Sequence, residues 1–258
     1  MTGKLTRGFL ALALPIALAA TWWLASAGST NPYYPPLSEI VRNFGDVWTS
    51  DQLRTHLLPS LASLILGLAL AAVFGVAGGI AMGYSERLRR DVRPTIEFLR
   101  ATPVVALIPI ALVLLGPGTQ MEVTMIAFAA TWPIVVATTD GVRAADEVML
   151  DTVRVFGITA RGRLLRVALP SALPQVMGGV RIAVAVAVAT MLVTNMVGSS
   201  AGLGYFVISA QQSFNLKETW AGLLLIGIVG CGTTFVVAVA ERLVLRWHRL
   251  WRAKEVET

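Results

Sequence analysis

A polar loop separates two long apolar runs of this chain, and its central stretch reads Asp151-Thr152-Val153-Arg154-Val155-Phe156-Gly157. The apolar run 121–140 precedes the loop, and the run 176–197 follows it. The gap of about 35 residues is longer than the connection between packed helices usually is. Apolar side chains gather on one side of 147–156 and again of 160–168, which predicts two short helices. Gly157 lies between them and is suited to the left-handed conformation that ends a helix.

The second predicted helix carries basic side chains on its polar side, namely Arg161, Arg163 and Arg166. Leu169-Pro170 follows, and Pro174 comes one helical turn later. Proline disfavours continuation of a helix, so we expect both prolines to redirect the chain into the next apolar run. Two short helices held at an angle form a compact knob that suits a groove on a partner. Periodicity alone leaves an alternative, an ordinary loop whose arginines only mark the inner side of a membrane.

Apolar runs of the length that a membrane-spanning helix needs recur along the chain. Six such runs cover residues 9–27, 57–83, 95–115, 121–140, 176–197 and 219–241. With 55% hydrophobic and only 14% charged residues, the chain is too apolar for an ordinary soluble domain. The sequence predicts an all-α polytopic membrane protein with six transmembrane helices in a single domain, 1–258. The loop 141–175 and the segment 28–56 then lie on opposite sides of the membrane.

The basic residues fix the orientation of these runs. When alternate segments are placed inside, only Arg42, Arg54 and Lys217 of the 21 basic residues fall outside. This asymmetry follows the positive-inside rule and predicts that both the N-terminus and the C-terminus are cytoplasmic. The net charge of +6 therefore reflects membrane topology. A nucleic-acid partner is not expected, because its footprint would cluster on one folded face.

The first run has a second interpretation. Lys4 and Arg7 precede an apolar stretch that ends near Ala25-Ser26-Ala27, which also fits a cleavable signal peptide. The stretch from Phe9 to Leu24 is longer than the usual apolar region of about 7–15 residues. The other five runs keep their orientation in either case.

Two apolar runs carry unusual residues. The run 57–83 contains Gly75, Gly79 and Gly83 at four-residue spacing, which allows close approach of a helix within the subunit or of a second subunit. The run 95–115 contains Pro103 and Pro109, and broken backbone at membrane depth is tolerated where it lines a polar path. Near its start, Glu97 and Arg100 are three residues apart and are expected to pair.

The central loop resembles the loop by which permease subunits of ABC importers bind their ATPase. In that family the pattern runs Glu-Ala-Ala, three residues, Gly, nine residues, an aliphatic residue, one residue and Leu-Pro. Gly157, Val167 and Leu169-Pro170 match this spacing, while Asp151 replaces the glutamate and Thr152-Val153 replace the alanines. The stretch 99–118 and the pair Trp132-Pro133 are similar to nitrate/sulfonate/taurine-type permeases.

The resemblance implies a type I ABC importer in a bacterial cytoplasmic (inner) membrane. It implies two permease copies around one path, two cytoplasmic ATPase subunits on the coupling loops, and an external substrate-binding protein. The ATPase contacts fall to Asp151, Arg154, Gly157, Arg161, Arg163, Leu169, Pro170 and Pro174. This chain contains no Gly-rich phosphate loop, so ATP and Mg are expected on the partner, with no cofactor and no catalytic residue here.

The candidate path residues are Arg100, Pro103, Trp132, Thr190, Thr194 and Asn195. An amide in hydrocarbon must be satisfied, so Asn195 either lines a polar path or forms an interhelical hydrogen bond. Related permeases often have a glutamate at this position. The stretch 198–205 resembles the family's Gly-rich external turn, on the surface where a binding protein would dock.

Two other functional classes are considered. A secondary transporter or channel would need ion-coupling carboxylates or inverted repeats, which the sequence does not display. A membrane enzyme would need a catalytic constellation, and His56 and His248 are isolated, so no metal site is expected either. We expect a small anionic solute such as a sulfonate, taurine or nitrate, or alternatively a vitamin or heterocyclic precursor.

Overall fold

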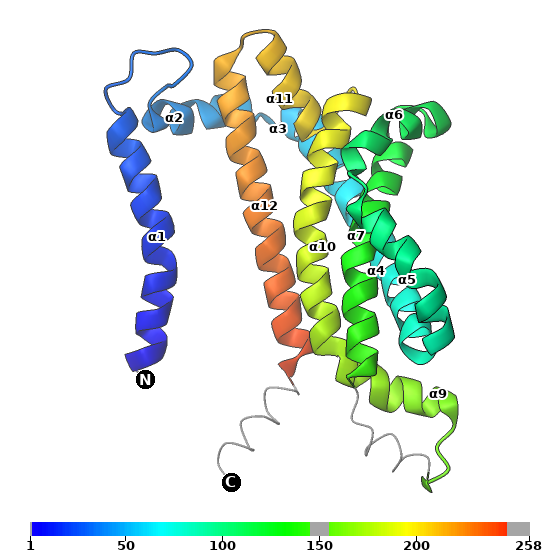
Figure 1. The fold of residues 1–258 in the computed structure, drawn as a ribbon. Helices are drawn as coiled ribbons and strands as arrows, with labels where there is room; N and C mark the ends of the chain where they lie inside the picture. The colour runs from blue at the N-terminus through cyan, green and yellow to red at the C-terminus, as the bar shows by residue number, and fades with distance from the viewer. Residues whose placement is uncertain (1, 145–154, 247–258) are drawn as a thin grey trace.

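The computed structural model describes residues 2–144 and 155–246, with side chains from residue 13 onward except those of residues 160, 161 and 165. Within these residues all regular structure is helical. Figure 1 shows long helices running side by side, with short helices at both ends of the assembly. Four helices are long and apolar enough to cross a membrane: Ser50–Tyr84, Thr119–Arg143, Arg166–Gly198 and Leu216–Val244. The predicted all-helical membrane class is therefore confirmed.

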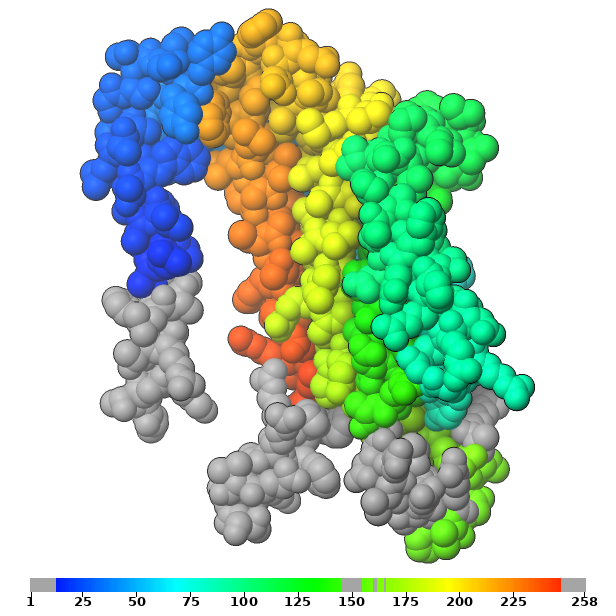
Figure 2. Space-filling model, in the orientation of Figure 1, coloured from blue at the N-terminus to red at the C-terminus, as the bar shows by residue number. Residues whose placement is uncertain are grey.

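The first helix, α1 (Thr2–Ser26), stands beside the others and meets them near its C-terminal end (Figure 1 and Figure 2). There the rings of Trp22 and Trp220 lie 6.0 Å apart. The apolar part with described side chains, Ala13–Ser26, is shorter than a full span. The Ser26 hydroxyl accepts a hydrogen bond of 3.0 Å from the Leu37 amide, which joins the end of α1 to the segment that follows it.

The segment 28–56 contains α2 (Leu37–Val47), an amphipathic helix that begins directly after Pro36. Its apolar side contacts protein: Ile40 and Trp48 are buried, and the Trp48 indole donates to the Ala221 carbonyl at 3.1 Å. The short helices α3 (Ser50–Gln52) and η1 (Leu53–Leu57) then lead into α4 (Leu58–Tyr84).

The core is formed by α4, α7 (Thr119–Arg143) and α10 (Leu169–Gly198), which pack along their lengths. Glycines on α4 face side chains on α7 at close range. A Cβ added at Gly75 would lie 2.7 Å from Ile134 Cβ, and one at Gly79 would lie 2.8 Å from the Val135 carbonyl oxygen. The glycine stripe therefore packs within one subunit, which decides between its two interpretations.

The third predicted run, 95–115, is not one straight helix but falls on a bent pair of helices. The polar helix α5 (Glu86–Ala101) and the apolar helix α6 (Val104–Leu115) meet at 93°. The break falls at Pro103, as expected, and Thr102 ends α5 with a hydroxyl bond of 2.9 Å to the Phe98 carbonyl. Pro109 lies inside α6 and does not break it.

The entry into α10 also differs from the expectation. Helix α9 (Ala160–Arg163), the π-helical segment η2 (Leu164–Ala168) and α10 follow one another without interruption. Pro170 lies in the first turn of α10, and Pro174 lies inside the helix, so neither residue ends the helical path. A proline in a first turn is well tolerated because its missing N–H would lack an intrahelical partner there.

Two further helices complete the described chain. The short helix α11 (Leu203–Gln212) follows a turn in which Gly202 has φ of +100°, and α12 (Leu216–Val244) returns along α10. Buried residues of α4, α7, α10, α11 and α12 form the main apolar cluster. At the other end of α12, Glu241 forms an ion pair with Arg181 of α10.

Candidate functional site

The described part of the loop that the sequence predicts to bind a partner, residues 155–168, lies below α7 and α10 in Figure 1. The φ of Gly157 is +71°, so the expected left-handed conformation is present. Directly before it, Val155 and Phe156 expose 86% and 78% of their surface. Adjacent apolar side chains this exposed are characteristic of a surface that another protein covers. Asp151 and Arg154, predicted for the same surface, lie outside the described residues.

The second half of the loop is tied to the core. The Thr159 hydroxyl accepts from the Gly162 amide at 3.2 Å and so caps α9, which contains Arg161 and Arg163. Leu169, Pro170 and Pro174 are half-buried. Ala172 is fully buried, and a Cβ added at Gly141 of α7 would lie only 3.0 Å from its Cβ. Movement of this part of the loop must therefore involve α7 and α10 together.

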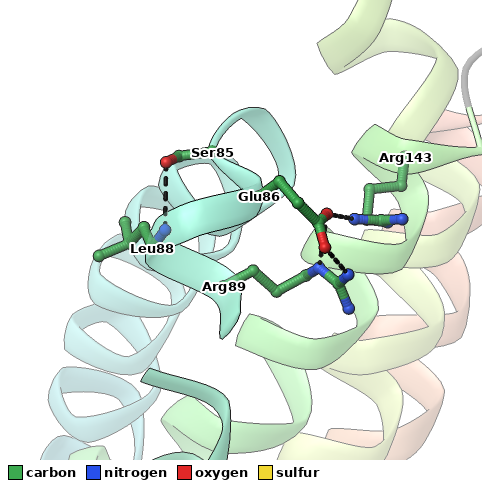
Figure 3. Close-up of polar contacts among 5 residues, drawn as sticks. All are labelled: Ser85, Glu86, Leu88, Arg89 and Arg143. Carbon is green, nitrogen blue, oxygen red and sulfur yellow. Dashed lines mark hydrogen bonds and ion pairs between the residues drawn. The ribbon is translucent and has the colours of Figure 1, made fainter. Parts of the chain in front are cut away.

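Ion pairs join the end of α7 to the start of α5 (Figure 3). The Glu86 carboxylate accepts a hydrogen bond of 2.6 Å from Arg143 and also pairs with Arg89. Ser85 caps α5 by accepting from the Leu88 amide at 3.2 Å. The two guanidinium groups, Arg89 first, lower the pKa of Glu86 from 4.5 to about 2. Glu86 is thus ionised throughout the neutral range and holds both arginines.

The candidate path residues fall into two groups, and the first lies around the break between α5 and α6. Arg100 is in the last turn of α5, Pro103 precedes α6, and Trp132 lies on α7. Arg100 does not pair with Glu97 as expected, because the Glu97 carboxylate accepts instead from Arg93 at 2.8 Å. Arg93 and Arg100 lie four residues before and three residues after Glu97, so both share its helix face.

The second group is buried between helices of the chain. Thr190 and Thr194 donate their hydroxyls to carbonyls of α10 itself. Asn195 is completely buried and accepts a bond of 2.6 Å from Ser60 of α4. The Ser60 hydroxyl in turn accepts from the Leu203 amide at 2.8 Å. Of the two roles considered for Asn195, this geometry provides the interhelical hydrogen bond.

Comparison with known proteins agrees with this arrangement. The family described as "Binding-protein-dependent transport system inner membrane component" matches residues 71–249. The chain belongs to this family. Its relatives include the putative aliphatic sulfonates transport permease protein SsuC of Bacillus subtilis, 29% identical over 92% of this chain and 87% of the relative. The taurine transport system permease protein TauC of Escherichia coli is 27% identical over 91% and 88%, respectively.

A third relative carries a different solute name. The formylaminopyrimidine transport permease protein ThiX of Halalkalibacterium halodurans is 28% identical over 91% of this permease and 94% of the relative. Among solved structures, an inward-facing MetNI methionine ABC transporter aligns with a TM-score of 0.66 at 20% identity. That alignment covers 76% of this permease and 99% of the other chain, and it supports the shared fold. This permease is thus a multi-pass subunit of an ABC importer in the inner membrane.

Sequence reasoning missed a buried carboxyl in this permease. Glu122 is only 3% exposed and accepts a hydrogen bond of 2.6 Å from Ser63. Ser60 and Ser63 are three residues apart on α4, so the Glu122 and Asn195 contacts are one helical turn apart. The helix α7 begins directly after Gly116-Pro117-Gly118, and Glu122 lies in its first turn. A glutamate at this position of an apolar helix is the sequence signal that could have identified the buried carboxyl.

At the end of this permease that holds α2 and α11, a cavity of about 470 Å³ lies between the segment 29–43 and residues 214–220. Its lining includes Asn31, Glu39, Lys217 and Trp220. At its edge Phe214 is 76% exposed and has φ of +55°, a left-handed conformation that a phenylalanine rarely adopts. A strained, exposed aromatic side chain beside a cavity is a candidate contact for a partner.

No metal site is present among the described residues, since they contain no group of three or more possible ligands. His56 packs 5.2 Å from the ring of Phe206 and 6.2 Å from that of Tyr205. This histidine is therefore part of the packing between η1 and α11.

Proposed function

We propose that this ABC importer permease forms the path for a small anionic solute of the sulfonate, taurine or nitrate kind. The relatives named for aliphatic sulfonates and taurine support this class. The basic inner segments of the chain suit an anion as well. The relative named for formylaminopyrimidine supports the alternative, a vitamin or heterocyclic precursor moved by the same architecture.

The proposal includes the topology that the basic residues predict: six spans in a single domain 1–258, with both termini cytoplasmic. Two copies of the chain enclose the path. An external binding protein delivers the solute to the side that holds the segment 28–56 and the turn after Gly198. The cavity beside Phe214 supplies a surface of suitable size there.

We infer that the loop 141–175 binds a separate ATPase, which holds ATP and Mg. The exposure of Val155 and Phe156 at the Gly157 turn is the observation that carries this proposal. Binding of ATP would draw the two coupling loops together and open the path outward, and hydrolysis would reset it. Uptake without an ATPase, as in a secondary transporter, would contradict this proposal.

Copurification tests the ATPase contact. Replacement of an exposed aromatic contact by a carboxylate should desolvate a charge in the interface, so Phe156→Asp should reduce copurified ATPase at least about tenfold. Phe214→Asp is the matched control, because Phe214 is equally exposed at the opposite end of the molecule. ATPase recovery that is unchanged by Phe156→Asp, or equally reduced by Phe214→Asp, would contradict the assignment.

Growth tests the solute class. A strain that lacks the gene should fail to grow with an alkanesulfonate or taurine as sole sulfur source and should grow on sulfate. The intact gene should restore growth. Equal growth on all sources, in a strain with no second sulfonate system, would favour nitrate or the heterocyclic precursor.

A further inference from the structure

A basic cleft lies where α5 meets the core, below the break between α5 and α6. It has a volume of about 220 Å³. Helix α5 contributes most of its lining, α4 adds Met82, and α7 adds Val136, Thr139 and Asp140. The volume is below the roughly 300–1,000 Å³ of pockets for drug-sized ligands, so the cleft suits a small solute.

Three guanidinium groups face this cleft, from Arg89, Arg93 and Arg100, against the two carboxylates of Glu97 and Asp140. Two of the three are held in place by carboxylates: Arg89 pairs with Glu86, and Arg93 pairs with Glu97 at 2.8 Å. Arg100 forms no ion pair with any residue in the described part of the chain. Its charge is therefore available to a ligand, while the neighbouring arginines are already oriented.

A buried donor lies on the same side of α7. Trp132 precedes Val136 by four residues and Thr139 by seven, so helical periodicity places all three on one face. The indole Nε1 of Trp132 is buried and has no hydrogen-bond partner among the described residues. Trp132 packs with Met82 and Ile96, both of which line the cleft. Trp132 does not itself line the cleft, so its N–H marks a polar position behind the cleft wall and not a direct contact for a bound anion.

From these contacts we propose that the cleft is an anion-binding site for the transported solute, with Arg100 as its principal contact and Arg89 and Arg93 as supporting charges. A guanidinium forms paired hydrogen bonds with the oxygens of a sulfonate or carboxylate. The inference rests on the proposed function: it assigns part of the selectivity for anions to the permease itself, in addition to the proposed external binding protein. In this cleft the solute would lie beside the bend between α5 and α6, at the end of α5 that leads into the apolar helix α6.

Oxyanions could reach this cleft from two sources, the transported solute or the headgroup of an anionic lipid. The cleft lies between α4, α5 and α7; Thr139 in its lining is buried, while Arg93, Glu97 and Arg100 are exposed. Both sources present the same oxyanion chemistry to these arginines, and the two lipid compositions in the test below distinguish them.

Binding to the purified permease in nanodiscs tests the proposal without an ATPase or binding protein. The probe is ethanesulfonate, with ethyl methyl sulfone as the uncharged counterpart, in phosphatidylcholine discs and in discs that contain phosphatidylglycerol. Wild-type protein should bind ethanesulfonate and not the sulfone. Arg100→Gln should weaken binding about tenfold or more, and Arg100→Lys should weaken it less. Arg87→Gln, an exposed change on α5 outside the cleft, should leave binding unchanged.

Three results would overturn the assignment: equal binding by Arg100→Gln and wild type, equal loss in Arg87→Gln, or equal affinity for the sulfone. Loss of ethanesulfonate binding only in discs with phosphatidylglycerol would identify a lipid headgroup as the occupant and would also overturn it. None of these results depends on the ATPase contact. Failure of the cleft proposal is therefore distinguishable from failure of the importer function, which copurification tests.

Discussion

Glu86 and Arg143 join the start of α5 to the end of α7 through a hydrogen bond of 2.6 Å. The two residues are 57 positions apart in the chain. Arg143 is the last residue of α7 and lies at the start of the proposed ATPase-binding loop 141–175. Glu86 begins the helix that carries the basic cleft and ends at the bend before α6. The ion pair therefore provides a direct mechanical connection between the loop and the broken helix.

If this connection transmits the movement of the loop, its loss should uncouple ATP hydrolysis from uptake. We expect Glu86→Gln to lower ATP-coupled uptake about three- to tenfold while ATPase activity and membrane insertion are retained. Uptake and hydrolysis are measured together in proteoliposomes that contain the complete importer. Arg143→Glu should be equally impaired, and Glu86→Arg combined with Arg143→Glu should recover part of the uptake. Parallel loss of hydrolysis and uptake would contradict a coupling role.

The same pair has a defined response to pH. The Glu86 carboxylate has a lowered pKa. The stability that its ion pairs contribute is therefore fully present above pH 4.5, the ordinary pKa, and is lost as the pH falls through about 2. Coupled uptake should therefore show no titration assignable to Glu86 between pH 5 and 8. A difference between wild type and Glu86→Gln that disappears at pH 5 would contradict this expectation.

Close packing between α4 and α7 predicts a sharp contrast between neighbouring glycines. A Cβ at Gly79 would meet the Val135 carbonyl at 2.8 Å and Thr138 at still shorter distance, whereas one at Gly78 would lie 3.7 Å from Val135. Gly79→Ala should destabilise the permease by about 1–3 kcal/mol through overpacking and lower its melting temperature by several degrees. Gly78→Ala should have little effect. Equal melting temperatures of Gly79→Ala and Gly78→Ala, measured in detergent, would show that α4 and α7 can move apart to accept a methyl group without loss of stability.

The apolar runs predicted the long helices well, because a helix is the solution that satisfies backbone polar groups in lipid. The run 57–83 corresponds to Leu58–Tyr84 and the run 219–241 to Leu216–Val244. The same rule failed for α5, which begins at Glu86 and carries eight charged residues. An amphipathic helix at the membrane boundary has no apolar run, so only its final turns fell within the predicted span 95–115.

Contacts between distant residues explain the remaining differences. Ser60 and Asn195 are 135 positions apart, and no spacing rule brings them together. Glu97 has an arginine at helical spacing on each side, so spacing alone does not predict that it pairs with Arg93. Pro170 was expected to turn the chain, but it lies in a first turn where proline is compatible with a helix. Apolar periodicity and length locate the helices in the sequence. Which side chains pair, and whether a helix continues through a proline, depends on residues that are distant in the sequence.

The residues that can replace Gly157 should be limited by its backbone conformation and not by contact with neighbouring atoms. The φ of +71° strains any β-branched residue, although no atom of the described residues lies within 4 Å of an added Cβ. Gly157→Val should abolish ATP-coupled uptake while the protein still inserts. Gly157→Asn should retain most uptake, because asparagine tolerates the left-handed region. Normal coupled uptake by Gly157→Val would exclude the turn from ATPase docking, and equal loss in both variants would point to side-chain bulk.

The Ser60 hydroxyl provides a test of the connection between α4, α10 and α11. It donates to Asn195 and accepts from the Leu203 amide, so Ser60→Ala leaves a buried acceptor and a buried donor without this partner. We expect a loss of about 1–3 kcal/mol, measured by thermal unfolding in detergent. Ser209→Ala is the matched control, because that hydroxyl bonds only to the Phe206 carbonyl of its own helix. Asn195→Leu should cost less in the Ser60→Ala background than in the wild type, since the two residues share one interaction. Additive losses would show that Ser60 and Asn195 stabilise the permease independently, and the external turn would then be held by packing alone.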